Sequence, residues 1–250
     1  MLKTATEKSY AKHIVAASPI FTIKWLKGAI EGFEKILKSL NDFIQQKRDK
    51  FPRFYFLSSE EIIEILSDSN PVTVQPFMKK CFEGIDKLEF NDNCSEVRYL
   101  ISAQGERFLL NSKQNGMVIR DAAQVEVWLG DLEKAMKKQV QKLIRAFYTM
   151  IQSEKVEMEK RKDWILEPFS QVSITVDSIM WTTITEAYLL ADEDEGDMTE
   201  WHQTNVTQIQ ELITKIRGKL DKVSRKTLVA LITQDVHYRD IIKELYIAQC

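Results

Sequence analysis

The sequence contains few of the residues that interrupt helices or build metal and disulfide sites. Among 250 residues there are 8 glycines, 5 prolines, 3 cysteines and 3 histidines. Glycine and proline are the residues least compatible with a helix interior, so their scarcity favours a helical fold. The odd, small number of cysteines is typical of a reducing compartment and provides no disulfide framework. The histidines, at positions 13, 202 and 237, lie far apart and lack the spacing of metal ligands.

An excess of charge of one sign is also absent. The 35 basic and 37 acidic residues give a formal net charge of -2. Nucleic-acid binding needs a concentrated basic face, so this balance argues against a nucleic-acid partner. No apolar run approaches the roughly 20 residues that span a bilayer, and the first residues lack the apolar segment of a signal peptide. We therefore expect a cytoplasmic protein without a membrane partner.

Familiar catalytic patterns are missing as well. Gly218 and Lys219 are the nearest fragment of a phosphate-binding loop, but Leu220 follows where serine or threonine belongs. Cys81 lies in an apolar stretch, which predicts a buried, inert thiol. For His237 we favour a structural hydrogen bond over general-base work, because no nucleophile can be placed beside it. We expect no catalytic residue, no bound cofactor and no metal site.

The most basic stretch of the chain lies near its end. It comprises Lys215, Arg217, Lys219, Lys222, Arg225 and Lys226. We interpret it as a solvated helix–turn–helix face. The alternative is a contact with an acidic surface, including the acidic run at 192–197 of this same chain.

Apolar spacing predicts a long first helix over about residues 19–50. Its stripe recurs at alternating intervals of four and three, through Leu26, Ile30, Phe33, Leu37, Leu40 and Ile44. Pro52 ends this helix, and the aromatic-rich residues 51–57 are expected to be extended chain. Ser58 and Glu61 then form a capping box for a short helix. Another helix is expected over about 73–85.

The middle of the chain favours strands. Residues 96–101 and 106–110 flank a short loop that contains glycine, which predicts a hairpin, and residues 87–90 add a third strand to what we expect to be the only sheet. Helical periodicity returns from about residue 125. The helices expected there cover about 125–147, 172–190, 198–220 and 224–247.

These elements predict a mainly α fold, an elongated multi-helix bundle with one small β-hairpin insertion. We divide the chain into an N-terminal helical part, a β-hairpin region and a C-terminal helical bundle. Their expected bounds are 19–86, 87–120 and 121–250.

Four segments of the sequence resemble dynein heavy chains, in the linker region that precedes the first AAA+ module. They occur in family order and cover most of the chain. They are KRDKFPRFYFLSSEEIIEIL (47–66), VQPFMKKCFEGI (74–85), VEVWLGDLEKAM (125–136) and, within 216–240, IRGKL, RKTLVALI and DVHYRD. The first and last are long and unusual enough to be specific, and the second is closer to axonemal than to cytoplasmic dyneins.

This resemblance implies a mechanical role in a microtubule motor. In the family, the linker is a largely helical lever across a ring of AAA+ modules, and its straightening is the power stroke. ATP and Mg would be bound by the downstream ring of the parent chain, so this segment would carry no active site. The implied partners are the AAA+ ring of the same heavy chain, other dynein subunits and, only through the parent motor, the microtubule. The implied location is the cytoskeleton, in the axoneme of a cilium or flagellum.

A lever also needs a place to bend, and hinges are usually a few residues at element ends. Because Pro52 stops the long helix, we expect a hinge or a ring contact in the aromatic segment. Its candidate residues are Phe51, Pro52, Arg53, Phe54, Tyr55 and Phe56. Two other hypotheses are a stand-alone helical adaptor or scaffold without motor activity and, with less support, an enzyme whose site has no familiar pattern.

Overall fold

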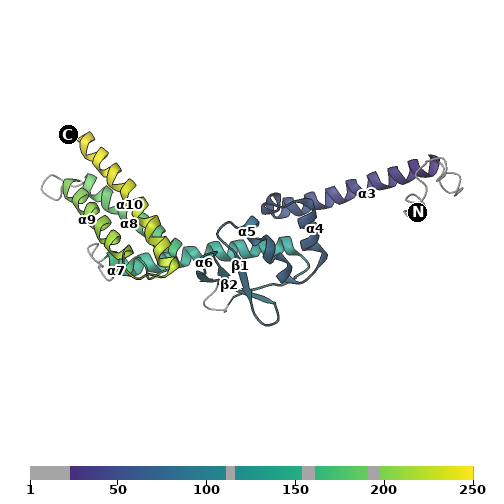
Figure 1. Ribbon diagram of the computed structural model, residues 1–250, viewed down its shortest axis with the longest axis horizontal. Helices are drawn as coiled ribbons and strands as arrows, with labels where there is room; N and C mark the ends of the chain where they lie inside the picture. The colour runs from purple at the N-terminus through teal and green to yellow at the C-terminus, as the bar shows by residue number, and fades with distance from the viewer. Residues whose placement is uncertain (1–22, 111–115, 154–160, 191–197, 250) are drawn as a thin grey trace. The chain divides into compact units, whose positions relative to one another are not determined.

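The computed structural model describes residues 23–110, 116–153, 161–190 and 198–249. The chain divides into two compact units, residues 1–68 and 69–250. Each unit is described by itself below. The described residues are mainly α-helical with one small antiparallel sheet, which confirms the predicted fold class (Figure 1).

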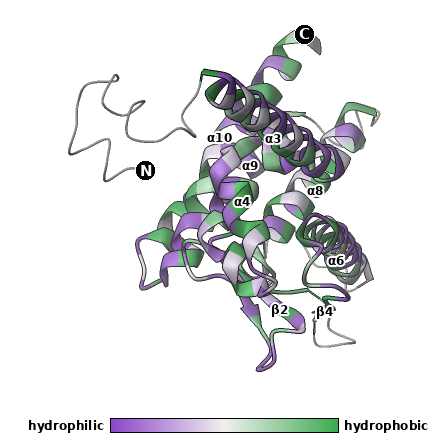
Figure 2. Cartoon of the chain, turned by 90° about the vertical axis from the view of Figure 1, so that its right-hand side faces the viewer, coloured by the Kyte–Doolittle hydropathy of each residue, from purple (hydrophilic) through white to green (hydrophobic). Residues whose placement is uncertain are grey.

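In the first unit, the described residues 23–68 form a long helix followed by two short ones. α3 covers Ile23–Lys50, η1 is a 3₁₀ helix over Pro52–Phe56, and α4 covers Ser59–Ser67. The hydropathy colours of α3 alternate between apolar and polar along the helix, as expected of an amphipathic helix (Figure 2). Ile44 is nevertheless the α3 residue that is buried. Most of the predicted stripe therefore lies on the surface.

The predicted capping box at the start of α4 is confirmed. The hydroxyl of Ser58 accepts a hydrogen bond from the backbone N–H of Glu61 at 3.3 Å, and the Glu61 carboxylate accepts one from the N–H of Ser58 at 2.9 Å. These bonds satisfy two donors that the first turn of a helix leaves unpaired. Ile62 and Ile65 then bury the inner face of α4.

The second unit opens with two short helices, where the sequence predicts one helix over 73–85. η2 is a 3₁₀ helix over Pro71–Phe77, and α5 covers Met78–Cys81. Pro76 lies inside this stretch and has no N–H to donate, which prevents a continuous α-helix there. Cys81 is buried, as predicted.

The sheet has four antiparallel strands, with β2 in the middle. Its strands are β1 (Lys87–Phe90), β2 (Glu96–Ile101), β3 (Arg107–Leu109) and β4 (Met117–Val118). β1 pairs with one edge of β2, and β3 and β4 also pair with β2. The three predicted strands are confirmed, and β4 is an addition that its two-residue length hides in the sequence. Gly105, with φ +90°, makes the tight turn between β2 and β3 possible.

Five further helices lie in the described part of the second unit. They are α6 (Val125–Ser153), α7 (Arg161–Trp164), α8 (Ser170–Leu190), α9 (Met198–Ile216) and α10 (Lys222–Gln249). The four long ones confirm the predicted helices to within a few residues. α8, α9 and α10 pack together beside the second half of α6 (Figures 1 and 2). The acidic run at 192–197 lies outside the described residues.

α6 has buried side chains near both of its ends. Its first turns bury Val125, Trp128 and Leu132. Its last turns place Phe147 and Ile151 in the apolar core formed with α8, α9 and α10. At about 1.5 Å per residue, this 29-residue helix is roughly 43 Å long. None of the described helices is long and apolar enough to cross a membrane.

Candidate functional site: the aromatic turn and the helical bundle

The predicted hinge segment folds as a compact 3₁₀ turn. We call residues 51–57 the aromatic turn. Buried side chains recur there every third residue, at Phe51, Phe54 and Leu57, which matches the three residues per turn of a 3₁₀ helix. The N–H of Phe54 donates to the carbonyl of Phe51 at 3.0 Å, and the N–H of Leu57 donates to that of Phe54 at 3.1 Å. The expectation of extended chain over 51–57 was therefore wrong, because Pro52 begins a 3₁₀ helix that is stabilised by apolar side chains buried at every third residue.

Polar side chains fasten the aromatic turn to the end of α3. Arg48 donates to the carbonyl oxygen of Leu57 at 3.1 Å. Gln45 donates to the hydroxyl oxygen of Tyr55 at 2.5 Å, and this hydroxyl donates to Asp49 at 3.3 Å. The rings of Phe51 and Phe54 meet edge to face with their centroids 5.1 Å apart. Polar contacts thus hold the turn to α3, and the two phenylalanine rings pack within the turn.

The six candidate residues divide into a buried inner set, Phe51 and Phe54, and an outer set, Pro52, Arg53, Tyr55 and Phe56. Phe51 and Phe54 are buried and stabilise the turn. Pro52 is exposed, and Arg53 is half-buried. Tyr55 and Phe56 are 56% and 68% exposed. Exposed aromatic side chains are typical of protein contacts, so the outer set suits a binding role better than the inner one.

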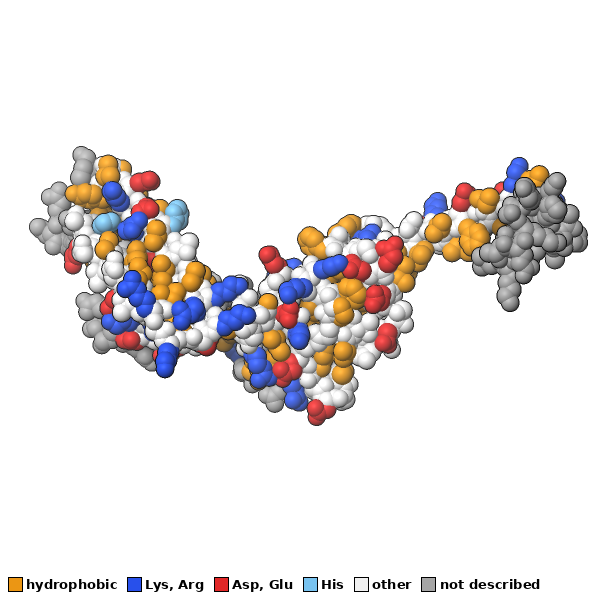
Figure 3. All heavy atoms as spheres, in the orientation of Figure 1, with side chains coloured by type: hydrophobic (Ala, Val, Ile, Leu, Met, Phe, Trp, Pro, Cys, Tyr) orange, Lys and Arg blue, Asp and Glu red, His pale blue; other side chains and the backbone are white. Residues whose placement is uncertain are grey.

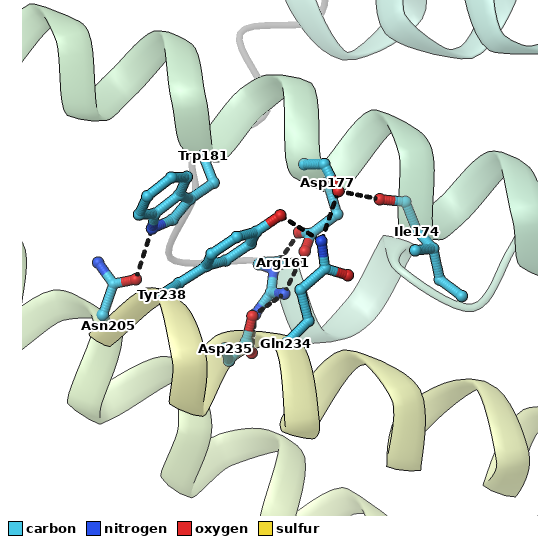
Figure 4. A network of polar contacts seen from close by, with 9 residues as sticks. Arg161, Ile174, Asp177, Trp181, Asn205, Gln234, Asp235 and Tyr238 are labelled. Carbon is cyan, nitrogen blue, oxygen red and sulfur yellow. Dashed lines mark hydrogen bonds and ion pairs between the residues drawn. The ribbon is translucent and has the colours of Figure 1, made fainter. Parts of the chain in front are cut away.

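A second notable site lies inside the helical bundle, where one arginine joins two aspartates. We call Arg161, Asp177 and Asp235 the ion network (Figure 4). Arg161 of α7 donates to both carboxylate oxygens of Asp177 on α8, at 2.5 and 2.6 Å. It also donates to both oxygens of Asp235 on α10, at 2.9 Å each. All three residues are buried, so the network ties α7, α8 and α10 together through their interior.

Burial and charge act in opposite directions in this network. Burial by itself lowers the pKa of Arg161, but the charges and hydrogen bonds of Asp177 and Asp235 outweigh it and hold the pKa above its ordinary value. Burial raises the pKa of Asp235, although Arg161 opposes that change. A buried guanidinium needs these partners because an unpaired buried charge is strongly destabilising.

Further polar contacts continue from the ion network along the bundle. Gln234 donates to the hydroxyl of Ser178 at 2.6 Å and also contacts the hydroxyl of Tyr238. The ring of Tyr238 stacks on Trp181 with centroids 4.0 Å apart, and the indole N–H of Trp181 donates to Asn205 at 3.1 Å (Figure 4). Side chains of α8, α9 and α10 are thereby linked in one layer.

The ion network was not predicted from the sequence. No helix was expected between about residues 147 and 172, whereas Arg161 begins α7 and is buried. Asp177 was the available signal, since it is a carboxylate between the apolar residues Val176 and Ile179 of α8. His237 was singled out instead, but its neighbour Asp235 carries the buried contact.

The turn between β2 and β3 contacts the same bundle. One carboxylate oxygen of Glu106 accepts hydrogen bonds from the N–H of Ser170 at 2.8 Å and from its hydroxyl at 2.7 Å. The hydroxyl of Ser170 in turn accepts one from Thr227 of α10 at 2.7 Å. We call Glu106, Ser170 and Thr227 the clasp. It joins the sheet, the start of α8 and α10.

Part of the predicted basic cluster has a structural role. Arg225 donates to the carbonyls of Ile216 and Gly218 at the end of α9, at 2.8 and 3.2 Å, and Lys215 contacts the carbonyl of Lys162. Basic side chains at a helix C-terminus complete its unpaired carbonyls. Arg217, Lys219, Lys222 and Lys226 are exposed. Within the described ranges, histidine, cysteine and acidic residues form no group of three that could hold a metal ion.

Comparison with known proteins defines the class to which this fold and these segments belong. The model of the dynein heavy chain N-terminal region 2 matches residues 1–147. The chain belongs to the dynein heavy chain family, which confirms the resemblance drawn from the sequence.

Individual relatives are axonemal or flagellar dyneins. The chain is 37% identical to dynein axonemal heavy chain 12 of Homo sapiens over 235 residues, which are 94% of this chain and 7% of the relative. It is 37% identical to dynein axonemal heavy chain 3 of Mus musculus over 93% of this chain and 5% of the relative. It is 34% identical to the dynein-1-beta heavy chain of the flagellar inner arm I1 complex of Chlamydomonas reinhardtii, over 90% and 5%. The chain therefore spans about 5–7% of the length of these relatives.

Proposed function

We propose that this chain is part of the linker of an axonemal dynein motor and acts as a lever. The observation that carries this proposal is α6, a 29-residue helix that has buried side chains near both ends. A helix anchored at both ends transmits force along its axis without folding changes. The ion network and the clasp support the same role, because they join helices and sheet into a unit that resists deformation.

The catalytic part of this function lies outside the chain. ATP and Mg would bind to the AAA+ ring of the parent heavy chain, and the lever would respond to nucleotide in that ring. The partners are the ring, other dynein subunits and, through the parent motor only, the microtubule. The location is the axoneme of a cilium or flagellum.

We assign the contact with the ring to the outer set of the aromatic turn. Tyr55 and Phe56 present exposed aromatic surface, while Phe51 and Phe54 keep the turn in shape. Bending near this turn would require rotation at the end of α3, where Arg48 and Gln45 hold it. Comparison of bent and straight structures of the linker tests this position of the hinge. A rotation located elsewhere in the linker would contradict it.

The transcript beyond the codon for Cys250 tests the motor assignment. A frame that continues into a strand and a Gly-x-x-x-x-Gly-Lys-Ser/Thr loop is the expected result, because that loop binds nucleotide phosphates. A stop codon directly after Cys250 would favour the alternative, a helical adaptor without motor activity.

Microtubule gliding by the complete heavy chain tests the contact. Substitution of Phe56 by alanine should slow gliding without lowering the amount of folded protein, because Phe56 is 68% exposed. Ile63→Ala is a suitable control, since Ile63 is 40% exposed on the neighbouring α4. Unchanged velocity in the Phe56→Ala variant would contradict the assignment.

A further inference from the structure

The exposed side of α3 has the sequence pattern of a coiled coil. Written as heptads, Ile23, Ile30 and Leu37 occupy position a, and Leu26, Phe33 and Leu40 occupy position d. This repeat of 3.5 residues is the pattern with which one helix packs against another. All six side chains are between 37% and 75% exposed. Figure 3 shows hydrophobic side chains along the visible face of this helix.

The area of this face exceeds what a monomer usually exposes. Together with Ile36 and Phe43 at position g, the a and d residues leave on the order of 800 Å² uncovered, against roughly 300–600 Å² for the largest apolar patch of a typical monomer. About 800 Å² per partner is also what a standard protein interface buries. Ile44, the next residue at position a, marks the end of the exposed face, because it is buried.

We propose that α3 pairs with α3 of a second copy of this chain as an antiparallel two-helix coiled coil. In such a pair each a residue faces a d residue of the partner helix. A two-fold axis between Glu31 and Gly32 places Ile23 opposite Leu40, Leu26 opposite Leu37, and Ile30 opposite Phe33. Every a and d residue from 23 to 40 then has a partner, and the interface is self-complementary, as two-fold symmetry requires.

The flanking charges select this register. Lys27 and Glu34 are the charged residues at position e, and the same axis places Lys27 of each copy opposite Glu34 of the other. The opposite flank brings Ala29 beside Ile36, which adds apolar contact. In a parallel pair, each position e faces the position g that precedes it by five residues on the partner, so Glu34 would face the uncharged Ala29 and not Lys27. The antiparallel pair therefore gains two ion pairs that a parallel pair lacks.

The mass of the whole 250-residue chain in solution tests the pairing. Light scattering after gel filtration should give twice the monomer mass of 29.1 kDa. Ile30→Glu with Phe33→Glu places charge at the centre of the interface and should raise the dimer Kd roughly 100-fold or more. Both residues are largely exposed, so circular dichroism should show an unchanged fold. The control Lys35→Glu changes the net charge by the same amount on the opposite face of α3 and should leave the dimer intact.

A charge exchange tests the antiparallel register. Lys27→Glu should raise the dimer Kd roughly tenfold, because it creates two like-charge contacts. Adding Glu34→Lys should restore the original Kd to within a few-fold. A monomeric wild-type chain, or a dimer that survives Ile30→Glu with Phe33→Glu, would overturn the pairing and leave this face to another helix, such as one elsewhere in a longer heavy chain. Failure of the exchange to restore binding would overturn the register.

Discussion

Glu106 and Ser170 are 64 residues apart in sequence, yet one carboxylate oxygen of Glu106 accepts hydrogen bonds from both the backbone N–H and the hydroxyl of Ser170. A carboxylate at this position satisfies an unpaired donor of the first turn of α8 and interacts favourably with the positive end of the helix dipole. The rings of Phe108 and Phe169 lie beside this contact, with centroids 4.8 Å apart. The turn of the hairpin thus supplies α8 with a cap from outside its own sequence.

Removal of this cap should weaken the second unit. Glu106→Ala should lower the free energy of unfolding by about 1–2 kcal/mol, the usual effect of losing a helix cap. Urea denaturation measures this loss, and amide hydrogen exchange at the start of α8 should become faster. Glu83→Ala is the control, since Glu83 is exposed. Equal unfolding energies for the two variants would show that the clasp contributes no stability.

Removal of the positive charge from the ion network should have a larger effect. Arg161→Met leaves Asp177 and Asp235 buried without their cation, which should cost about 3–5 kcal/mol of unfolding free energy. The matched control replaces all three residues, with leucine at both aspartates, and should recover most of the loss because no buried charge remains. If the unfolding free energy of Arg161→Met lay within about 1 kcal/mol of the wild-type value, this role of the ion network would be contradicted.

Asp221 should make the start of α10 sensitive to acid. The hydroxyl of Ser224 donates to its carboxylate and, together with backbone N–H groups, lowers the pKa of Asp221 below its ordinary value of 3.8. An acid with a lowered pKa stabilises the folded state above its ordinary pKa, and this contribution is lost as the pH falls through the folded value. The melting temperatures of the wild type and Asp221→Asn should therefore differ more at about pH 6 than at about pH 2, which are the approximate ends of the titration.

The Ser224→Ala variant serves as the control for this pH dependence. It removes the first of the contacts that lower the pKa of Asp221, so its stability should depend less steeply on acid pH. A wild-type and Asp221→Asn difference that stays constant across this range would refute the assignment.

Two phenylalanines of the aromatic turn provide a matched pair. Phe54 is 0% exposed, and Phe54→Ala should lower the unfolding free energy by about 3–5 kcal/mol through loss of burial and formation of a cavity. Phe56 is 68% exposed, and Phe56→Ala should change it by at most about 0.5 kcal/mol. Chemical denaturation of both variants measures this contrast. Similar losses of unfolding free energy for the two variants would mean that burial of every third side chain does not stabilise the turn.

The fold was largely predictable where local patterns decide structure. The capping box of Ser58 and Glu61, the strands β1, β2 and β3 and the four long helices of the second unit follow from side-chain chemistry within a few residues. The break at Pro76 was missed, although proline itself signals it. The hinge and the ring contact remain predictions.

The sequence by itself determined the helical class, the main element bounds and the family to which the chain belongs, because periodicity, caps and family segments are all local properties of the chain. Only the tertiary structure decided that Arg161 is buried, since its partners Asp177 and Asp235 are 16 and 74 residues away. It also decided that most of the α3 stripe stays exposed while Phe51 and Phe54 are covered. A side chain is buried or exposed according to which distant segments pack against it, and that choice is made by the energetics of the whole unit.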